Sequence, residues 1–329
     1  MNVEAYLNGI FPRSDFALES GSSWLKGRVT KDDYYKILEK ETIELIELQH
    51  NLGLDYVTDG QLFWDDFLRQ IAIALELHRE NSNANENPVT RQIYTNTFYR
   101  KPIILNKIGN GKEIIDTEFI NKTQEGKRKI ILPSPFALAY LSDGIHRNED
   151  GTIKNDIFAE VLLNIAKILN NEIHRLEKES KISFVQFNEP CIAYADEAKS
   201  FWSIINESLR IATKDVKAIT SLHLYNGDVS KFLPELLELP VNRIGFDAYA
   251  TNIRKFADSK KFLEIGIINS KNSLIEKPEA IVKYARQIQD TINPEGLALV
   301  PNRPLELVPQ QIAIKKIENL AKAAHLLRD

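Results

Sequence analysis

Short apolar runs alternate with longer amphipathic stretches along the second half of this chain. Five runs have the length and the apolar character of buried strands, at residues 182–187, 218–224, 243–248, 262–268 and 296–300. The stretches after them have a helical period, at residues 199–214, about 228–238, 252–258, 278–292 and 308–327. Strands that alternate with helices predict βαβ units and therefore a parallel sheet.

The first half of the chain extends this pattern. Thr30 caps a predicted helix that runs to about residue 51, where Gly53 ends it. Short strands are predicted at 9–11, 54–60 and 128–135, and a long helix at about 156–178. Because the count reaches eight strands, we expect a (β/α)8 TIM barrel with residues 1–329 as one domain. No Gly-rich phosphate-binding motif follows a strand, which disfavours an open doubly wound sheet.

An insertion is expected after the second strand, over about residues 61–127. It contains the Asn-rich segment 80–88, which we interpret as a mobile loop. Two segments rich in aromatic and amide side chains, 62–66 and 94–100, flank this loop and contribute Trp64, Asn96 and Tyr99. They form either a flat wall for a planar ring or the packing of the insertion on the barrel, and the sequence leaves both open.

Composition narrows the class of partner. The chain has 42 basic and 46 acidic residues, interspersed, with a formal net charge of −4, so no basic face predicts binding to nucleic acid or to an anionic membrane. No signal peptide and no run of 18 apolar residues is present, and we expect a soluble, cytoplasmic protein with a small-molecule or protein partner. One cysteine, Cys191, excludes an internal disulfide and a multi-thiolate metal site.

Polar residues follow the predicted strands, where the catalytic residues of a TIM barrel lie. The candidates for substrate binding at these strand ends are Arg13, Asp59, Asn188, Tyr225, Asp247, Asn302 and Arg303. Glu189 is a candidate general acid or base or a ligand for an ammonium group; the alternative is an ion pair with Arg13 or Arg303. His223 is a candidate proton carrier or metal ligand; the alternative is a hydrogen bond to a neighbouring carbonyl.

These residues resemble the cobalamin-independent methionine synthase family, in which a methyl group passes from a folate-type pterin to the zinc-bound thiolate of homocysteine. Phe11-Pro12-Arg13 resembles the family's opening Phe-Pro-Arg. Residues 49–60 resemble its Gln-x-x-x-Gly-hydrophobic-Asp segment, and residues 186–190 resemble its Gln-Ile-Asp-Glu-Pro. The resemblance runs nearly end to end.

Three segments resemble the zinc-free N-terminal barrel of the full-length enzymes: residues 60–66, 266–272 and 305–309. In the zinc-bearing C-terminal barrel the metal is held by a His-x-Cys pair, a Glu and a later Cys. The positions that match these ligands read His223, Tyr225, Asp247 and Arg303. Although His223, Asp247 and Glu189 offer N and O donors, we expect no metal site and no zinc, because both cysteines are replaced.

The resemblance also implies ligands. A methyl-pterin of the folate type is the possible ligand, and Arg303 is suited to bind a carboxylate such as a glutamate tail. Arg13 is followed by Ser14-Asp15-Phe16 rather than by a basic cluster, and Asn188 replaces an Asp that would face an amino-acid ammonium group.

Three functions are compatible with the sequence. The first is the zinc-free subunit of a split methionine synthase, which docks on a separate zinc-bearing barrel and assists methyl transfer from a pterin to homocysteine. The second is a self-sufficient methyltransferase acting on another thiol or a corrinoid donor, with Glu189 and His223 as proton carriers. The third is a non-catalytic module that binds a pterin or an amino acid. Whether the chain is an enzyme by itself is left open.

Overall fold

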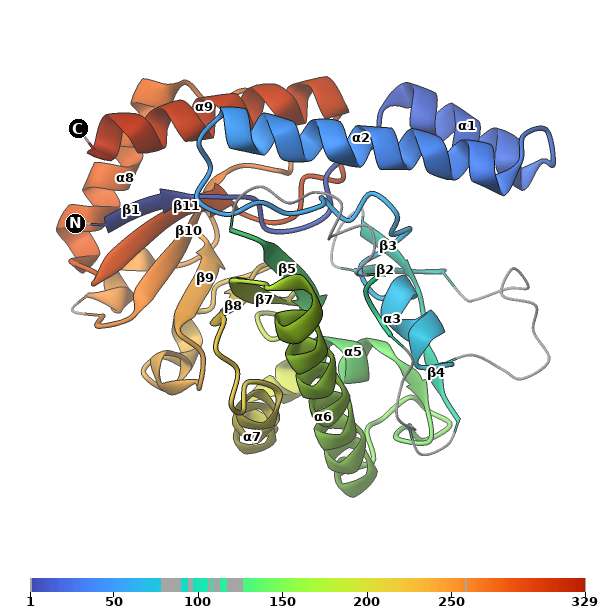
Figure 1. Cartoon of the computed structure of the whole chain (residues 1–329). Helices are drawn as coiled ribbons and strands as arrows, with labels where there is room; N and C mark the ends of the chain where they lie inside the picture. The colour runs from blue at the N-terminus through green and yellow to red at the C-terminus, as the bar shows by residue number, and fades with distance from the viewer. Residues whose placement is uncertain are drawn as a thin grey trace.

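The fold is built on a curled parallel sheet (Figure 1). The computed structural model describes residues 2–77, 90–93, 97–105, 108, 113–116, 127–257 and 259–328. Seven strands pair in the order β1-β11-β10-β9-β8-β7-β5, and every pair is parallel. Their bounds are β1 Asn2–Ala5, β5 Lys129–Pro133, β7 Phe184–Glu189, β8 Ile219–Leu224, β9 Arg243–Asp247, β10 Phe262–Ile268 and β11 Gly296–Pro301.

An eighth segment closes the sheet between β1 and β5. The Asp55 amide donates to the Ala5 carbonyl at 3.0 Å, which attaches the segment to β1. Val57 forms a parallel bridge with Arg128, and the Lys129 amide donates to the Val57 carbonyl at 2.8 Å, which attaches it to β5. The strands and this segment therefore form the predicted (β/α)8 TIM barrel, in which the second strand is reduced to a single β-bridge at Val57.

Helices cover the outside of the barrel. The long ones are α1 Asp15–Leu25, α2 Lys31–Asn51, α6 Asn155–Ser180, α7 Trp202–Ala212, α8 Pro278–Ile292 and α9 Gln310–Arg328. The predicted Thr30 cap is present, because its hydroxyl accepts from the Asp33 amide at 3.1 Å. α1 and α2 form a hairpin that extends beyond the barrel at one side (Figure 1). In the part of the chain that is described, no helix is long and apolar enough to cross a membrane.

Shorter elements connect these. They are the helices α3 Arg69–Ala74 and α5 Pro135–Leu141, the 3-10 turns Asp196–Lys199, Ser230–Phe232, Glu235–Glu238 and Ile253–Phe256, and the strands β2 Thr90–Ile93, β3 Thr97–Arg100, β4 Ile103–Ile104 and β6 Asp143–Gly144. α3, the antiparallel β2–β3 hairpin and β4 lie within the predicted insertion. The Asn-rich segment 80–88 lies outside the described residues.

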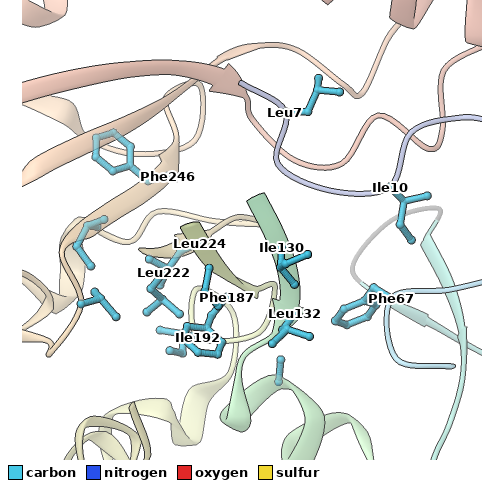
Figure 2. Close-up of a cluster of buried hydrophobic side chains, with 14 of the residues drawn as sticks. Leu7, Ile10, Phe67, Ile130, Leu132, Phe187, Ile192, Leu222, Leu224 and Phe246 are labelled. Atoms are coloured by element: carbon cyan, nitrogen blue, oxygen red, sulfur yellow. The ribbon is translucent and has the colours of Figure 1, made fainter. Parts of the chain in front are cut away.

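Two apolar layers result from the alternation of side chains along the strands. Phe187, Leu222, Leu224 and Phe246 point outward and pack against the helices, as Figure 2 shows for one part of this core. Inside the barrel, Tyr6, Tyr56 and Phe184 meet edge to face with ring centroids 4.9–5.5 Å apart. Full burial of each such apolar side chain stabilises the fold by about 1.5–3 kcal/mol.

Two sequence predictions were wrong. The first strand is β1 Asn2–Ala5 rather than 9–11, and it was missed because its Glu4 is polar yet buried in an ion pair with Arg243. Gly9 lies in the loop above this strand, where a Cβ would approach Pro304 to 2.4 Å. The helix predicted at 228–238 is two 3-10 turns, because Pro234 interrupts it.

Candidate functional site

The side chains at the carboxyl ends of the strands meet around Asn8. Its Nδ2 donates to the Pro301 carbonyl at 2.5 Å and lies 3.0 Å from Nε2 of His223. The backbone carbonyl of Asn8 accepts from Asn188 Nδ2 at 3.0 Å and from Gln186 Nε2 at 2.9 Å. Asn8, which the sequence did not single out, therefore joins β1, β7, β8 and β11 at the mouth of the barrel.

His223 is fully buried on β8. Its Nε2 also lies 3.2 Å from the carbonyl of Asn302, and its Nδ1 lies 3.5 Å from Oε2 of Glu264 on β10. A carbonyl therefore lies within reach of the ring, as the predicted alternative requires, but which nitrogen donates depends on the tautomer; the neighbouring carboxylate was not predicted. Gly245 makes this contact possible, since a Cβ there would lie 2.1 Å from Nδ1 and 2.7 Å from Oε2.

Glu189 is also fully buried, at the end of β7. One carboxylate oxygen accepts from the amides of Cys191 and Ile192 at 2.7 and 3.0 Å, and the other accepts from the hydroxyl of Ser134. Burial raises the pKa of Glu189 to about 7, although these hydrogen bonds oppose the shift. The alternative of an ion pair with Arg13 or Arg303 is wrong, because the oxygens are taken by Ser134 and the turn after the strand.

Tyr225 and Arg303, which the resemblance aligns with the family's two cysteines, are both buried. Burial raises the pKa of Tyr225 well above its ordinary value, although the Arg303 charge opposes the shift. Ser270 fixes this end of β11, because its hydroxyl donates to the Arg303 carbonyl at 2.7 Å and its amide donates to Asn302 Oδ1 at 2.9 Å.

Asp247, at the end of β9, is fully buried. Its Oδ1 accepts from the Tyr249 amide at 2.9 Å, and its Oδ2 lies 3.2 Å from the Lys271 ammonium. Lys271 stands in the loop after β10 and is partly exposed. The mouth therefore combines the Asp247–Lys271 ion pair, the buried Arg303 guanidinium, which lies 3.9 Å from the Glu306 carboxylate, and several amides.

The other candidates contact different parts of the chain. Arg13 donates to the carbonyls of Leu62 and Trp64 at 2.7 and 2.9 Å, and Trp64 is buried in the apolar core. Asp59 holds a turn by accepting from the Gln61 amide at 3.0 Å, and burial raises its pKa. Asn96 lies outside the described residues.

A cavity of about 670 Å³ lies between the α1–α2 hairpin and residues 63–73. Its aromatic lining comprises Trp24, Tyr34, Tyr35, Phe63 and Tyr99, and its cations are Arg13, Lys31, Arg69 and Arg100. Trp24 and Tyr34 are stacked, with centroids 5.5 Å apart. Of the predicted aromatic wall, Phe63 and Tyr99 line this cavity. The contribution of α1 and α2 was not predicted, because it depends on how the hairpin folds back.

The residues that the resemblance aligns with the family's zinc ligands do not fit zinc. A phenol that remains protonated and a guanidinium replace the two thiolates, and Asp247 already pairs with Lys271. His223 is enclosed by Asn8, Asn302 and Glu264. Across the described ranges, no group of three His, Cys, Asp or Glu side chains is placed to hold an ion.

Comparison with known proteins agrees with this architecture. The family model "Cobalamin-independent synthase, Catalytic domain" matches residues 7–326. A methionine synthase from Sulfurisphaera tokodaii is 24% identical, with 98% of this chain and 91% of that protein covered. One from Saccharolobus solfataricus is 25% identical, with 98% and 93% covered.

Two solved structures share the fold. The B12-independent methionine synthase from Shewanella sp. W3-18-1, in complex with selenomethionine, superposes with a TM-score of 0.76 at 16% identity, covering 99% of this chain and 97% of that one. A putative B12-independent methionine synthase from Listeria monocytogenes has a TM-score of 0.73 at 16% identity, covering 99% of each. The resemblance to the N-terminal-type barrel stays a prediction, since the matching model describes the catalytic domain. The chain belongs to the cobalamin-independent methionine synthase family.

Proposed function

We propose that this chain is the zinc-free subunit of a split cobalamin-independent methionine synthase. It binds the methyl-pterin donor and assists methyl transfer to homocysteine held by a separate zinc-bearing barrel. The observation that carries this proposal is the replacement of the zinc ligands by Tyr225, Arg303 and a Lys271-paired Asp247. Because a homocysteine thiol needs a metal or another strong cation to ionise near neutral pH, the activated thiolate has to come from the partner.

The cavity beside α1 and α2 supports binding of the donor. A pterin is planar and stacks on aromatic rings, and its glutamate tail is anionic. Arg69 and Arg100 line the same cavity together with Asp65 and Asp66; burial and the Arg100 charge lower the pKa of Arg69, and the two carboxylates oppose this shift. An anionic tail beside Arg69 and Arg100 would add to the compensation that these carboxylates give.

Purified protein separates the candidate functions. We expect no stoichiometric zinc by metal analysis, no methyl transfer by the chain alone, and methyl transfer when it is mixed with a zinc-bearing barrel from the same organism. Turnover by the chain alone, abolished in Glu189→Gln, would instead identify a self-sufficient methyltransferase. Pterin binding without any effect on a zinc-bearing barrel would identify a binding module.

Donor binding is measured separately, by quenching of tryptophan fluorescence with a methylated pterin triglutamate. Arg100→Gln should weaken binding about tenfold, because it removes one cation from the cavity. Arg254→Gln, at an exposed position in the turn Ile253–Phe256, is the matched control and should leave binding unchanged. Equal affinity in both variants would contradict the assignment of the cavity.

A further inference from the structure

A buried carboxylate lies behind the histidine at the barrel mouth. Glu264 Oε2 and His223 Nδ1 are 3.5 Å apart, both residues are fully buried, and neither atom has a hydrogen-bond partner elsewhere among the described residues. A buried polar atom without a hydrogen-bond partner lowers stability, and these two atoms, which face each other across Gly245, satisfy each other if Nδ1 carries the proton.

The other ring nitrogen is constrained independently. Asn8 Nδ2 donates to the Pro301 carbonyl at 2.5 Å, which fixes the amide with its NH2 group toward His223. The second hydrogen of this group then points to Nε2, 3.0 Å away, so Nε2 accepts in the neutral ring. A proton on Nε2 would instead go to the Asn302 carbonyl at 3.2 Å.

The three protonation forms can therefore be compared. A neutral ring protonated on Nδ1 satisfies Glu264 and Asn8, and an imidazolium satisfies Glu264 and Asn302. A neutral ring protonated on Nε2 satisfies Asn302 alone and turns the Nδ1 lone pair toward a carboxylate. Both favoured forms keep the proton on Nδ1.

Glu264 is equipped to remain an anion in this place. Its other oxygen accepts from the Tyr6 hydroxyl at 3.0 Å. Burial alone would raise the pKa of Glu264, but the hydrogen bond with His223 and the charges of Lys129 and Arg243 hold it below its ordinary value. Arg243 forms its ion pair with Glu4, so its charge only partly compensates the negative charge of Glu264.

We propose that Glu264 is a positioning residue that keeps His223 protonated on Nδ1 and leaves the lone pair of the neutral ring on Nε2, beside Asn8 and Asn302. Any use of this nitrogen in methyl transfer rests on the proposed function. The arrangement itself does not depend on that function.

The test uses the full chain labelled with [15N]histidine. The protein has six histidines, and His223 is assigned by the resonances that disappear in His223→Gln. At a pH where the ring is neutral, we expect a pyrrole-type shift at Nδ1 and a pyridine-type shift at Nε2. A pyrrole-type shift at Nε2 in the wild-type chain would overturn the proposal without any need for a variant.

Glu264→Gln assigns the effect to the carboxylate. The amide that replaces it can present either oxygen or nitrogen to Nδ1, so the form protonated on Nε2 should become populated to at least a few tenths. Tyr6→Phe, which removes the neutral hydrogen bond but keeps the Glu264 charge, is the control and should leave the tautomer unchanged. An unchanged tautomer in Glu264→Gln would show that Asn8 alone sets it and would overturn the proposal.

The mixing experiment distinguishes failure of this inference from failure of the proposed function. If Glu264→Gln changes the tautomer and the wild-type chain does not stimulate a zinc-bearing barrel, the inference stands and the proposed function fails. If the wild-type chain stimulates transfer and Glu264→Gln stimulates it equally, the use of His223 in that transfer is contradicted.

Discussion

Glu189 illustrates what a strand-end residue type does and does not determine. The sequence predicted a carboxylate at the end of a buried strand, and the structure places it there, fully buried. Its partner Ser134 comes from the end of β5, and its other partners are backbone amides. Residue type and strand position can be predicted, whereas the partners depend on which strands become neighbours.

The raised pKa of Glu189 predicts a pH-dependent stability. Burial moves the pKa from 4.5 to about 7, so the native state keeps a proton that the unfolded chain releases near pH 4.5. This contribution is complete below about pH 4.5 and is lost as the pH rises through about 7, with a total of at most ~3 kcal/mol. Glu189→Gln should remove it, since an amide cannot ionise. Urea unfolding at pH 4.5 and pH 8 measures it, and an identical pH dependence in both proteins would refute the expectation.

Gly245 gives a second prediction for a single residue. A Cβ at this position would lie 2.1 Å from His223 Nδ1 and 2.7 Å from Glu264 Oε2, so neither partner can stay in place. Gly245→Ala should lower the free energy of unfolding by about 1–3 kcal/mol, as other overpacked cores do. It should also alter the [15N]histidine spectrum of His223. Thermal unfolding checks the first effect, and a variant as stable as the wild type would mean that the contact is looser than 3.5 Å indicates.

Glu264 and Asn8 could not be recognised from the sequence for a related reason. Glu264 stands inside an apolar run, where it reads as an isolated polar residue, and its role arises because β9 between it and His223 carries a glycine. Asn8 belongs to a segment predicted to precede the first strand, while it in fact follows that strand. Both omissions concern contacts across strands.

Among the elements, the loop after β10 is held by a buried lysine. Lys316 on α9 is fully buried, and its ammonium donates to the Asn269 carbonyl at 3.0 Å and to Glu276 at 2.9 Å. The same loop carries Lys271, the partner of Asp247 at the mouth. α9 therefore fixes a loop that completes the candidate site.

Lys316→Met should release this loop. Loss of one partner from a buried ion pair should cost roughly 2–4 kcal/mol, because the Glu276 carboxylate and the loop carbonyls lose their donor. Hydrogen exchange at Ser270 and Lys271 should accelerate more than at β7. Lys315→Met, at an exposed neighbouring position, is the matched control. Equal exchange in the two variants would show that the loop does not depend on α9.

Elements were predicted best where the pattern is local. The strands at 182–187 and 262–268 and the helix at 278–292 have continuous or periodic apolar residues, and the structure confirms them, with β7 beginning and ending two residues later than predicted. α5 was missed because it is short and apolar on most sides, and α1 because its apolar residues do not follow one face. Such elements are stabilised mainly by tertiary contacts and by the caps Ser134 and Ser14.

For the whole molecule, eight predicted strands were enough to predict a TIM barrel. The segment at Val57 pairs through a single β-bridge, and this was not predicted, since its Leu54-Asp55-Tyr56-Val57 sequence is typical of an ordinary strand. In the structure, side chains take over part of its role. Asp55 Oδ2 accepts from the Ala5 amide at 2.7 Å and from the Arg328 guanidinium at 2.5 Å.

Asp55 should therefore contribute to closure of the barrel more than its partly exposed position suggests. Asp55 joins its own segment to β1. Its partner Arg328 also donates to the Val3 carbonyl at 2.9 Å, so Asp55 connects both strands to the end of α9. Asp55→Ala should lower the free energy of unfolding by about 1–3 kcal/mol, since the Ala5 amide and the guanidinium lose an acceptor.

The matched control is Glu47→Ala on the exposed face of α2, which should change stability by less than about 0.5 kcal/mol. Urea unfolding gives both values, and an unchanged slope against urea would show that stability rather than the denatured state has changed. Part of the Asp55 effect is an exposed ion pair, which salt screens, so the difference in stability between the two variants should shrink in 0.5 M salt. It should not vanish, because the hydrogen bond from the Ala5 amide to Asp55 in the wild-type chain is not screened in this way. If salt abolishes the whole difference, the Asp55 side chain stabilises the barrel only through its ion pair with Arg328, and the segment at Val57 is held to β1 by backbone hydrogen bonds.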